Sequence, residues 1–191
     1  MAPADTQLPL DRAPRLPAFS LPRERAAAKL RDGKPLLHDE PVTLDLEFAA
    51  ERFLRLARQL QPSAAAEAIA QAVAGGQLDT GRLLTEAFVQ HADHLRQIAS
   101  ASPGLDHELI ASLATQAVEP LLRAYAERLA PLVHRLSCWE RGYCPVCGGR
   151  GVPGAHGGVE CAACGCTWAA AEAGPTSFRI ELAVPEDDEP W

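Results

Sequence analysis

Two Cys-x-x-Cys pairs stand close together in the C-terminal part of the sequence. Cys144 and Cys147 form the first pair, Cys161 and Cys164 form the second, and thirteen residues separate the two pairs. Two residues between cysteines let both sulfurs face one ion, and four thiolates in a tetrahedron are typical of zinc or of a single iron. A segment of about 40 residues buries too little apolar surface to fold alone. We therefore expect a metal ion to hold it together.

Glycine follows each cysteine pair, and a glycine-rich stretch separates the pairs. Gly148 and Gly165 can take the positive φ that a turn after each pair tends to need, which lets backbone amides bond to the sulfurs. The stretch between the pairs is long enough for two short strands and a loose turn. These features predict a zinc-ribbon or rubredoxin-like β module, with zinc as the expected metal and iron as the alternative. Disulfides are the competing interpretation, but in a reducing cytosol such spacing more often binds metal.

The sequence before the cysteines has the spacing of helices, with apolar residues three or four apart. Such patterns fill residues 23–33, 44–62, 63–76, 80–100 and 106–137. Asp106 is expected to cap the last of these helices, Pro120 to kink it or begin a new one, and Pro131 to kink it. Hydrophobic residues make up 47% of the chain and aromatic residues only 5%, which favours helices over strands. The predicted fold class is mainly α, a helical bundle followed by a small β module.

Changes in composition divide the chain into four segments. Residues 1–22 are expected to form a flexible proline-rich leader, residues 23–137 the helical bundle, residues 138–184 the four-cysteine ribbon, and residues 185–191 an acidic, solvated tail. Within the third segment, "SFRIELAV" alternates in the manner of a strand.

Charge and motifs exclude several classes of function. The net charge of −7 disfavours a nucleic-acid partner, because phosphates attract a basic patch. No apolar run is long enough for membrane insertion or export, so a cytoplasmic location is expected. No catalytic motif is present. Four cysteine ligands would leave a metal without an open position. We therefore expect a protein that is not an enzyme.

A few other residues could bind metal. His91 and His94 stand three apart on a predicted helix, but no further ligand cluster accompanies them in the sequence. We interpret both as ordinary surface or core histidines. His156, in the ribbon loop, could replace a ligand only if one cysteine were lost. Cys138 and Cys166 are expected to be small buried residues, the latter near the metal without binding it.

At the ribbon the sequence resembles the FdhE family of formate dehydrogenase accessory proteins. Members carry a tryptophan, then G-Y-C-P-V-C-G, and later C-x-x-C-G-T-x-W. The matching residues here are Trp139, Gly142, Tyr143, Cys144, Pro145, Val146, Cys147, Gly148, Cys161, Cys164, Gly165 and Trp168. The upstream sequence "GKPLL" at residues 33–37 (the GKPLL segment below) also resembles the family, and the ordered set covers roughly residues 23–168.

The resemblance implies a non-enzymatic maturation factor. It would bind, in the cytosol, the catalytic subunit of formate dehydrogenase or of a related molybdenum or tungsten oxidoreductase. Trp139, Tyr143 and Trp168 could then offer aromatic anchors to the partner, with packing inside the ribbon as the competing interpretation. Relative to the family, the chain is a short form without a second set of knuckles, and Cys166 stands where threonine is usual.

Two functions of other classes stay open. A zinc ribbon could be a nucleic-acid or transcription-associated module, but Arg141 and Arg150 are the only basic residues between Cys138 and Phe178, and phosphate binding would need more positive charge. Iron in the knuckles would instead make a rubredoxin-like electron-transfer protein.

Overall fold

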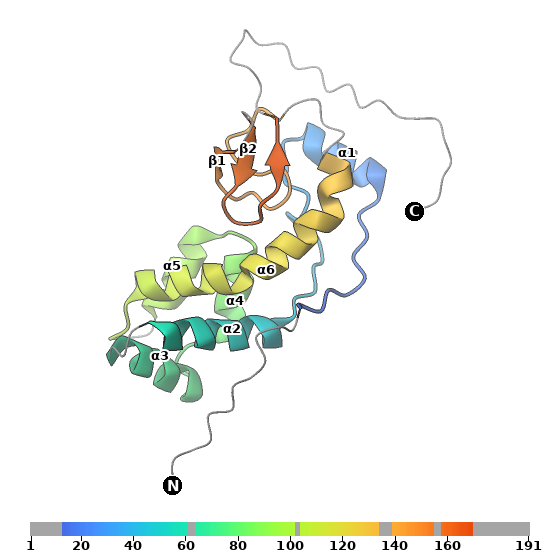
Figure 1. Cartoon of the computed structure of the whole chain (residues 1–191). Coiled ribbons are helices and arrows are strands. Elements are labelled where there is room, and N and C mark those ends of the chain that lie inside the picture. The colour runs from blue at the N-terminus through green and yellow to red at the C-terminus, as the bar shows by residue number, and fades with distance from the viewer. Residues whose placement is uncertain (1–12, 61–63, 102–103, 134–138, 155–157, 170–191) are drawn as a thin grey trace.

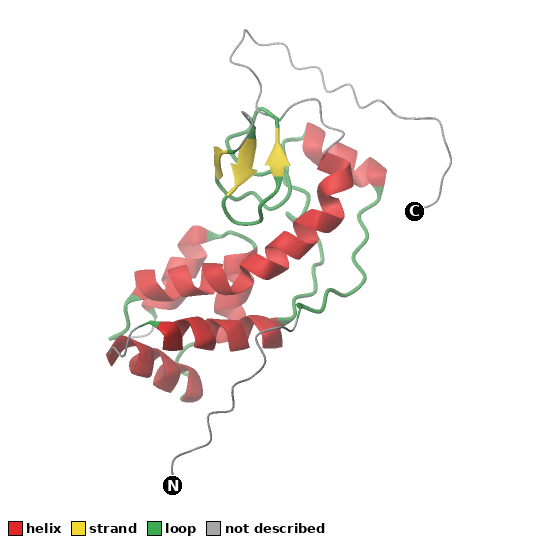
Figure 2. Ribbon diagram, viewed as in Figure 1, coloured by secondary structure: helices red, strands yellow, loops and turns green. Residues whose placement is uncertain are grey.

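A computed structural model describes residues 13–60, 64–101, 104–133, 139–154 and 158–169. Helices dominate these ranges, and a small sheet lies beside them (Figures 1 and 2). The helices are α1 (Arg23–Arg31), α2 (Leu46–Gln59), α3 (Ala64–Ala74), α4 (Thr80–Phe88), α5 (Ala92–Ser100) and α6 (His107–Val133). The predicted mainly α fold with a small β module is confirmed.

The sheet follows the helices in the chain. Its strands are β1 (Gly151–Pro153), β2 (Val159–Cys161) and β3 (Thr167–Trp168). They are antiparallel and lie in the order β1-β2-β3. The first two strands are the pair expected between the cysteine pairs, and the third strand was not predicted.

Some predictions fall outside the described residues. They concern the leader up to residue 12, the strand expected in "SFRIELAV", the acidic tail at residues 185–191, Cys138 and His156.

Helix α6 is the centre of the bundle. Helices α2, α4 and α5 pack against it, and α3 packs on α2 (Figure 1). The fully buried Tyr125 lies on α6, with its ring edge-on to Phe19 and Phe88 at centroid distances of 5.4 and 5.7 Å. Its hydroxyl donates to the carbonyl of Thr43 at 2.8 Å, so the one polar atom of this core side chain is satisfied.

Aspartates begin three of the helices. Asp45 accepts a hydrogen bond from the amide of Phe48, and Asp79 accepts one from the amide of Arg82. Asp106 accepts from the amides of residues 108 and 109, as expected of an N-cap. Each side chain satisfies backbone donors that the first turn leaves free.

Helix α6 runs through both of its prolines as a single helix, so Pro120 does not begin a new one. The helix axis turns near its middle (Figure 1). Pro120 has no amide hydrogen for the carbonyl of Gln116, four residues earlier. Arg52 of α2 donates to that carbonyl instead, from Nε at 3.2 Å. A cross-helix bond thus satisfies the acceptor that the proline leaves free.

The helix predicted over residues 80–100 is in fact two helices, and this prediction is wrong. Helix α4 ends at Phe88, and α5 begins at Ala92. Between them Gln90 takes a left-handed conformation, with φ of 61°. The amides of Gln90 and His91 donate to the carbonyls of Ala87 and Glu86, which is a Schellman ending. Glycine usually occupies this left-handed position, because a residue with a Cβ costs about 1–2 kcal/mol there. Here the position holds glutamine, so the sequence contains no glycine that would predict the break.

The GKPLL segment connects the helical part to the ribbon. The amides of Leu36 and Leu37 donate to the carbonyls of Pro145 and Val146, at 2.8 and 2.9 Å. Leu36 and Val146 are fully buried and belong to the same hydrophobic core as the bundle. Tyr143 adds a hydrogen bond from its hydroxyl to the carbonyl of Gly33 at 2.6 Å. The ribbon is therefore packed on a segment that lies more than one hundred residues earlier in the chain.

A buried ion pair holds α1 against the residues that follow it. Lys29 Nζ lies 2.7 Å from Glu40 Oε1, and these side chains are only 10% and 5% exposed. Lys29 also donates to the carbonyl of His38, and Arg25 reaches the same glutamate oxygen at 3.0 Å. Charges this far from water require partners, and this network supplies them.

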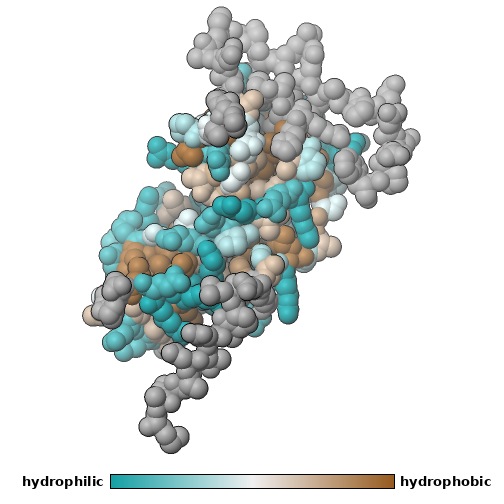
Figure 3. Space-filling model, in the orientation of Figure 1, coloured by the Kyte–Doolittle hydropathy of each residue, from teal (hydrophilic) through white to brown (hydrophobic). Residues whose placement is uncertain are grey.

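The surface is mixed in character. On the face seen in Figure 3, hydrophilic side chains cover much of the helices, and apolar surface appears as separate patches between them. Among the described residues, none of the helices combines the length and the apolarity needed to cross a bilayer.

Candidate metal centre

Four cysteine sulfurs lie together in the ribbon. Cys144 Sγ is 3.6 Å from Cys164 Sγ, and Cys147 Sγ is 3.5 Å from Cys161 Sγ. All four sulfurs lie within 4.8 Å of one another, and all four residues are buried. A zinc tetrahedron with bonds of about 2.3 Å has sulfur–sulfur edges of about 3.8 Å, whereas a disulfide is about 2.05 Å long. The cysteines are free and can bind one metal ion, and their geometry suits zinc and iron alike.

Backbone amides surround these sulfurs. Residues 144–149 form the first knuckle and residues 161–166 the second. The amides of Val146 and Gly149 donate to the sulfurs of Cys144 and Cys147 at 3.3 and 3.4 Å, and the amide of Ala163 donates to Cys161 at 3.4 Å. Donors aimed at sulfur stabilise its thiolate form.

The glycine after each pair has the conformation that the sequence predicted. The φ angles of Gly148 and Gly165 are 79° and 71°. Each amide donates to the carbonyl of the first cysteine of its own knuckle, at 3.0 and 2.9 Å. The two knuckles are thus built on the same turn, which brings both cysteine pairs to one point.

Other glycines of the ribbon are needed because neighbouring atoms approach closely. A Cβ on Gly149 would lie 3.1 Å from Cys161 Sγ and 3.2 Å from Cys147 Sγ. A Cβ on Gly151 would lie 2.6 Å from a methyl of Val159 and 3.0 Å from the indole of Trp168. Gly149 in the first knuckle and Gly151 at the start of β1 are therefore tightly packed positions.

The thiols share their protons unequally. Hydrogen bonds with the other cysteines of the ribbon hold the pKa of Cys144 below its usual range, and the bond with Cys147 has the largest effect. The hydrogen bond to Cys144, and then burial, raise the pKa of Cys147. The hydrogen bond of Cys161 with Cys144 raises its pKa, but those with Cys147 and Cys164 together outweigh this effect, so the pKa of Cys161 is lowered as well. Metal binding at all four sulfurs requires the release of the protons that the thiols still hold.

Cys166 lies beside the cluster and outside the group of four. It is partly buried, and its sulfur lies 3.8 Å from the carbonyl of Thr167. Its hydrogen bond with Cys144, followed by burial, raises the pKa of this thiol. A thiol that resists ionisation is a poor nucleophile.

The three aromatic residues predicted to bind a partner lie around the ribbon. Trp139 and Trp168 are only 5% and 7% exposed, and Tyr143 is partly buried. Trp139 donates from Nε1 to the carbonyl of Tyr143 at 2.6 Å, and their rings meet edge-on. Both tryptophans also line an open cleft of about 450 Å³, together with Val152. Partner binding by these residues stays a prediction.

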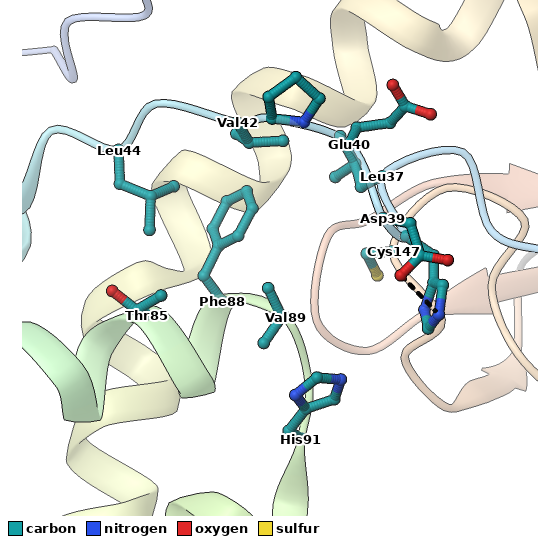
Figure 4. A pocket seen from close by; sticks show the side chains of 12 residues that line it. Leu37, Asp39, Glu40, Val42, Leu44, Thr85, Phe88, Val89, His91 and Cys147 are labelled. Carbon is teal, nitrogen blue, oxygen red and sulfur yellow. Dashed lines mark ion pairs between the residues drawn. The ribbon is translucent and has the colours of Figure 1, made fainter.

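A second cleft, of about 360 Å³, lies between the ribbon and the bundle (Figure 4). Its walls come from the residues between α1 and α2, from the end of α4 and from the first knuckle. Of the four cysteines, Cys147 lines this cleft, opposite Phe88 and His91. One edge of the four-cysteine site thus faces a hollow in the surface.

The structure also groups Glu86 with His91 and His94, one ligand atom of each lying within 4.8 Å of the others. The sequence showed no further ligand cluster beside these histidines, and the structure adds one carboxylate, that of Glu86. Both imidazoles are exposed, as expected of surface residues. The helix predicted over residues 80–100 did not suggest this group. The break at Gln90 folds the residues between α4 and α5 back, so that the amide of His91 bonds to the carbonyl of Glu86. The sequence gives no sign of a left-handed glutamine, so the group was missed.

No protein-family model matches the chain, and searches of curated proteins and of solved structures returned no match. What the site can do therefore follows from its own residues and geometry.

Proposed function

We propose that this protein is a non-enzymatic accessory factor. It binds, in the cytosol, the catalytic subunit of formate dehydrogenase or of a related molybdenum or tungsten oxidoreductase while that enzyme is assembled. The observation that carries the proposal is the cluster of four buried cysteines. A metal there has every position filled by protein sulfur and none open for substrate. Such a site serves to hold a surface in shape, and zinc is the metal we propose for it.

The contact between ribbon and helical part supports this proposal. The resemblance to the accessory protein family rests on two segments far apart in the sequence, the GKPLL segment and the first knuckle. These two segments lie against each other, joined by hydrogen bonds from Leu36 and Leu37. The two segments that carry the resemblance are thus packed together as one structural unit.

The open cleft beside the sheet is the contact surface that we propose. The indoles of Trp139 and Trp168 line it, and Val152 on β1 is 36% exposed beside them. Aromatic and apolar groups held in place on a rigid support are enriched at protein interfaces. Packing of the tryptophans and binding of a partner are compatible here, because both side chains line the cleft although they are nearly buried.

Affinity purification of the tagged chain from a formate-metabolising host tests the proposal. The catalytic subunit of an oxidoreductase is expected among the enriched proteins. Val152→Lys should reduce its recovery, whereas Leu46→Lys, at a residue of similar exposure on α2 (38%), should not. Lysine at position 152 faces Glu160 across the sheet, so the strand pair is kept. If the wild-type chain enriches no oxidoreductase subunit, the proposal fails.

Metal analysis of the purified protein tests the identity of the ion. One zinc per chain in the four-cysteine site, with no colour, is expected for a structural ribbon. A red protein with a reversible redox couple would contradict the choice of zinc and would favour electron transfer.

A further inference from the structure

Three side chains with metal-binding atoms meet where α4 gives way to α5. His91 Nδ1 lies 3.1 Å from Glu86 Oε2, and His94 Nδ1 lies 3.4 Å from the same oxygen. The two imidazole rings stand edge-on, with centroids 5.5 Å apart. The carboxylate is 20% exposed, and the imidazoles are 49% and 62% exposed. The group is thus open to solvent and accessible to an ion.

The spacing fits a small transition-metal ion. Zinc binds imidazole nitrogen and carboxylate oxygen at about 2.0–2.1 Å, so the edges of its tetrahedron are about 3.3 Å long. The two measured nitrogen–oxygen distances, 3.1 and 3.4 Å, lie on either side of that value. An ion could join these atoms with little movement of the side chains.

The backbone is held in an uncommon conformation to bring these residues together. Gln90 is one of two non-glycine residues with positive φ among the described residues. Its left-handed turn lets the amide of His91 donate to the carbonyl of Glu86 at 3.2 Å, so the link folds back on α4. His94 then lies in the first turn of α5, three residues after His91 and on the same side. Strained residues of this kind cluster at functional sites.

We propose that Glu86, His91 and His94 form a second metal site, for a divalent transition-metal cation such as Zn²⁺. Two imidazoles and one carboxylate are the ligands that zinc, cobalt, nickel and copper prefer. Unlike the four-cysteine site, this one has three protein ligands among the described residues, which leaves at least one position open. His91 also lines the cleft between bundle and ribbon (Figure 4). Water or a group bound in that cleft completes the coordination.

The competing explanation is a set of hydrogen bonds between surface side chains. Two imidazole N–H groups donating to one carboxylate oxygen would give the same distances. The two explanations predict different effects of Glu86→Gln on zinc binding and on the hydrogen bonds. A glutamine oxygen still accepts from imidazole, so the hydrogen bonds can persist. The negative charge that favours a cation is lost.

Zinc titration of the untagged, full-length protein tests the proposal once its four-cysteine site has been filled. Isothermal titration calorimetry with zinc chloride should show one further equivalent per chain. Glu86→Gln should weaken that step at least about tenfold, since even the loss of an outer hydrogen-bond partner of a metal ligand commonly costs 10–100-fold. The double variant His91→Ala/His94→Ala should abolish the step.

His107→Ala is the matched control. This histidine is also exposed and lies beside a glutamate, at 3.9 Å. Among the residues that the structure describes it has no third ligand, so its removal should leave the titration unchanged. Imidazole NMR signals of His91 and His94 should shift on zinc addition, and that of His107 should not. The proposal is overturned if the filled wild-type protein takes up no further zinc, or if Glu86→Gln binds it as tightly as the wild type.

Discussion

Leu36 donates its amide hydrogen to the carbonyl of Pro145 at 2.8 Å, and Leu37 does the same to Val146 at 2.9 Å. These bonds attach the GKPLL segment to the first knuckle. We expect the knuckle to keep its shape only while a metal ion holds its cysteines together, because so small a module folds with its metal. On this expectation, the position of residues near the start of the helical part depends on an ion at the four cysteines.

Removal of the metal should release the GKPLL segment together with the ribbon. Structural zinc contributes on the order of 10 kcal/mol to such modules, so a strong chelator, or Cys147→Ser, should unfold residues 139–169. Hydrogen exchange should then accelerate at the amides of Leu36 and Leu37, while amides in the middle of α6 stay protected. Most of the helical circular dichroism should persist. Loss of the whole helical signal would contradict this, and would show that bundle and ribbon unfold as one unit.

Gly151→Ala should destabilise the ribbon. The added methyl would meet Val159 at 2.6 Å and the Trp168 indole at 3.0 Å, and overpacking of this kind costs about 1–3 kcal/mol. Tryptophan fluorescence during thermal unfolding should report an earlier transition.

Gly142→Ala is the matched control for that change. No atom lies within 4 Å of a Cβ at this position, so the transition should not move. Equal effects of the two substitutions would mean that close packing at Gly151 is not what requires glycine.

Glu40→Gln should lower the free energy of unfolding by about 3–5 kcal/mol. The substitution leaves the ammonium of Lys29 buried without its counter-charge, and unpaired buried charges are strongly destabilising. Urea denaturation measures the loss. The neighbouring Asp39→Asn changes a carboxylate that is 68% exposed and should stay within about 0.5 kcal/mol of the wild type. A small effect of Glu40→Gln would mean that Lys29 finds enough compensation in the carbonyl of His38.

Tyr125→Phe should change how stability depends on pH. Burial raises the pKa of Tyr125 above 10.0, and the nearby Arg128 opposes this rise only in part. The folded state therefore holds the phenol proton more tightly than the unfolded state. Its contribution is complete below pH 10 and is lost as the pH rises toward the folded pKa.

Denaturation at a series of pH values from 8 to about 11 tests this. At pH 8 the wild type should be more stable than Tyr125→Phe by about 1 kcal/mol, for the hydrogen bond to Thr43. The difference should shrink above pH 10. A difference that stays constant over this range would contradict a raised pKa.

The features that the sequence predicted well are those with a local physical cause. Cysteine spacing and the glycines after each pair determine the two knuckles, so four converging sulfurs and positive φ at Gly148 and Gly165 follow without knowledge of the rest of the chain. Helical periodicity likewise found most of the bundle, and Asp106 caps α6 as expected.

The features that were missed depend on contacts between distant residues or on uncommon backbone. The break at Gln90 needs a left-handed glutamine that propensity disfavours, and it hid the proximity of Glu86 to His91. The GKPLL segment was noticed only as part of a family pattern, because its partner carbonyls lie in the knuckle about 110 residues later. Of the two outcomes predicted for Pro120, a kink or a new helix, the second is wrong, because α6 continues through it. The bond from Arg52 to the carbonyl that the proline leaves free joins distant residues and could not be read from the local pattern.

The distance along the chain between Gly33 and Tyr143 has a consequence for biosynthesis. The two residues are 110 positions apart, and a ribosome adds about 5–20 residues each second. Leu36 is consequently translated roughly 5–20 s before the knuckle that covers it. During that interval the apolar side chain of Leu36 lacks the cover that Pro145 and Val146 give it in the folded protein, and folding of the ribbon supplies that cover.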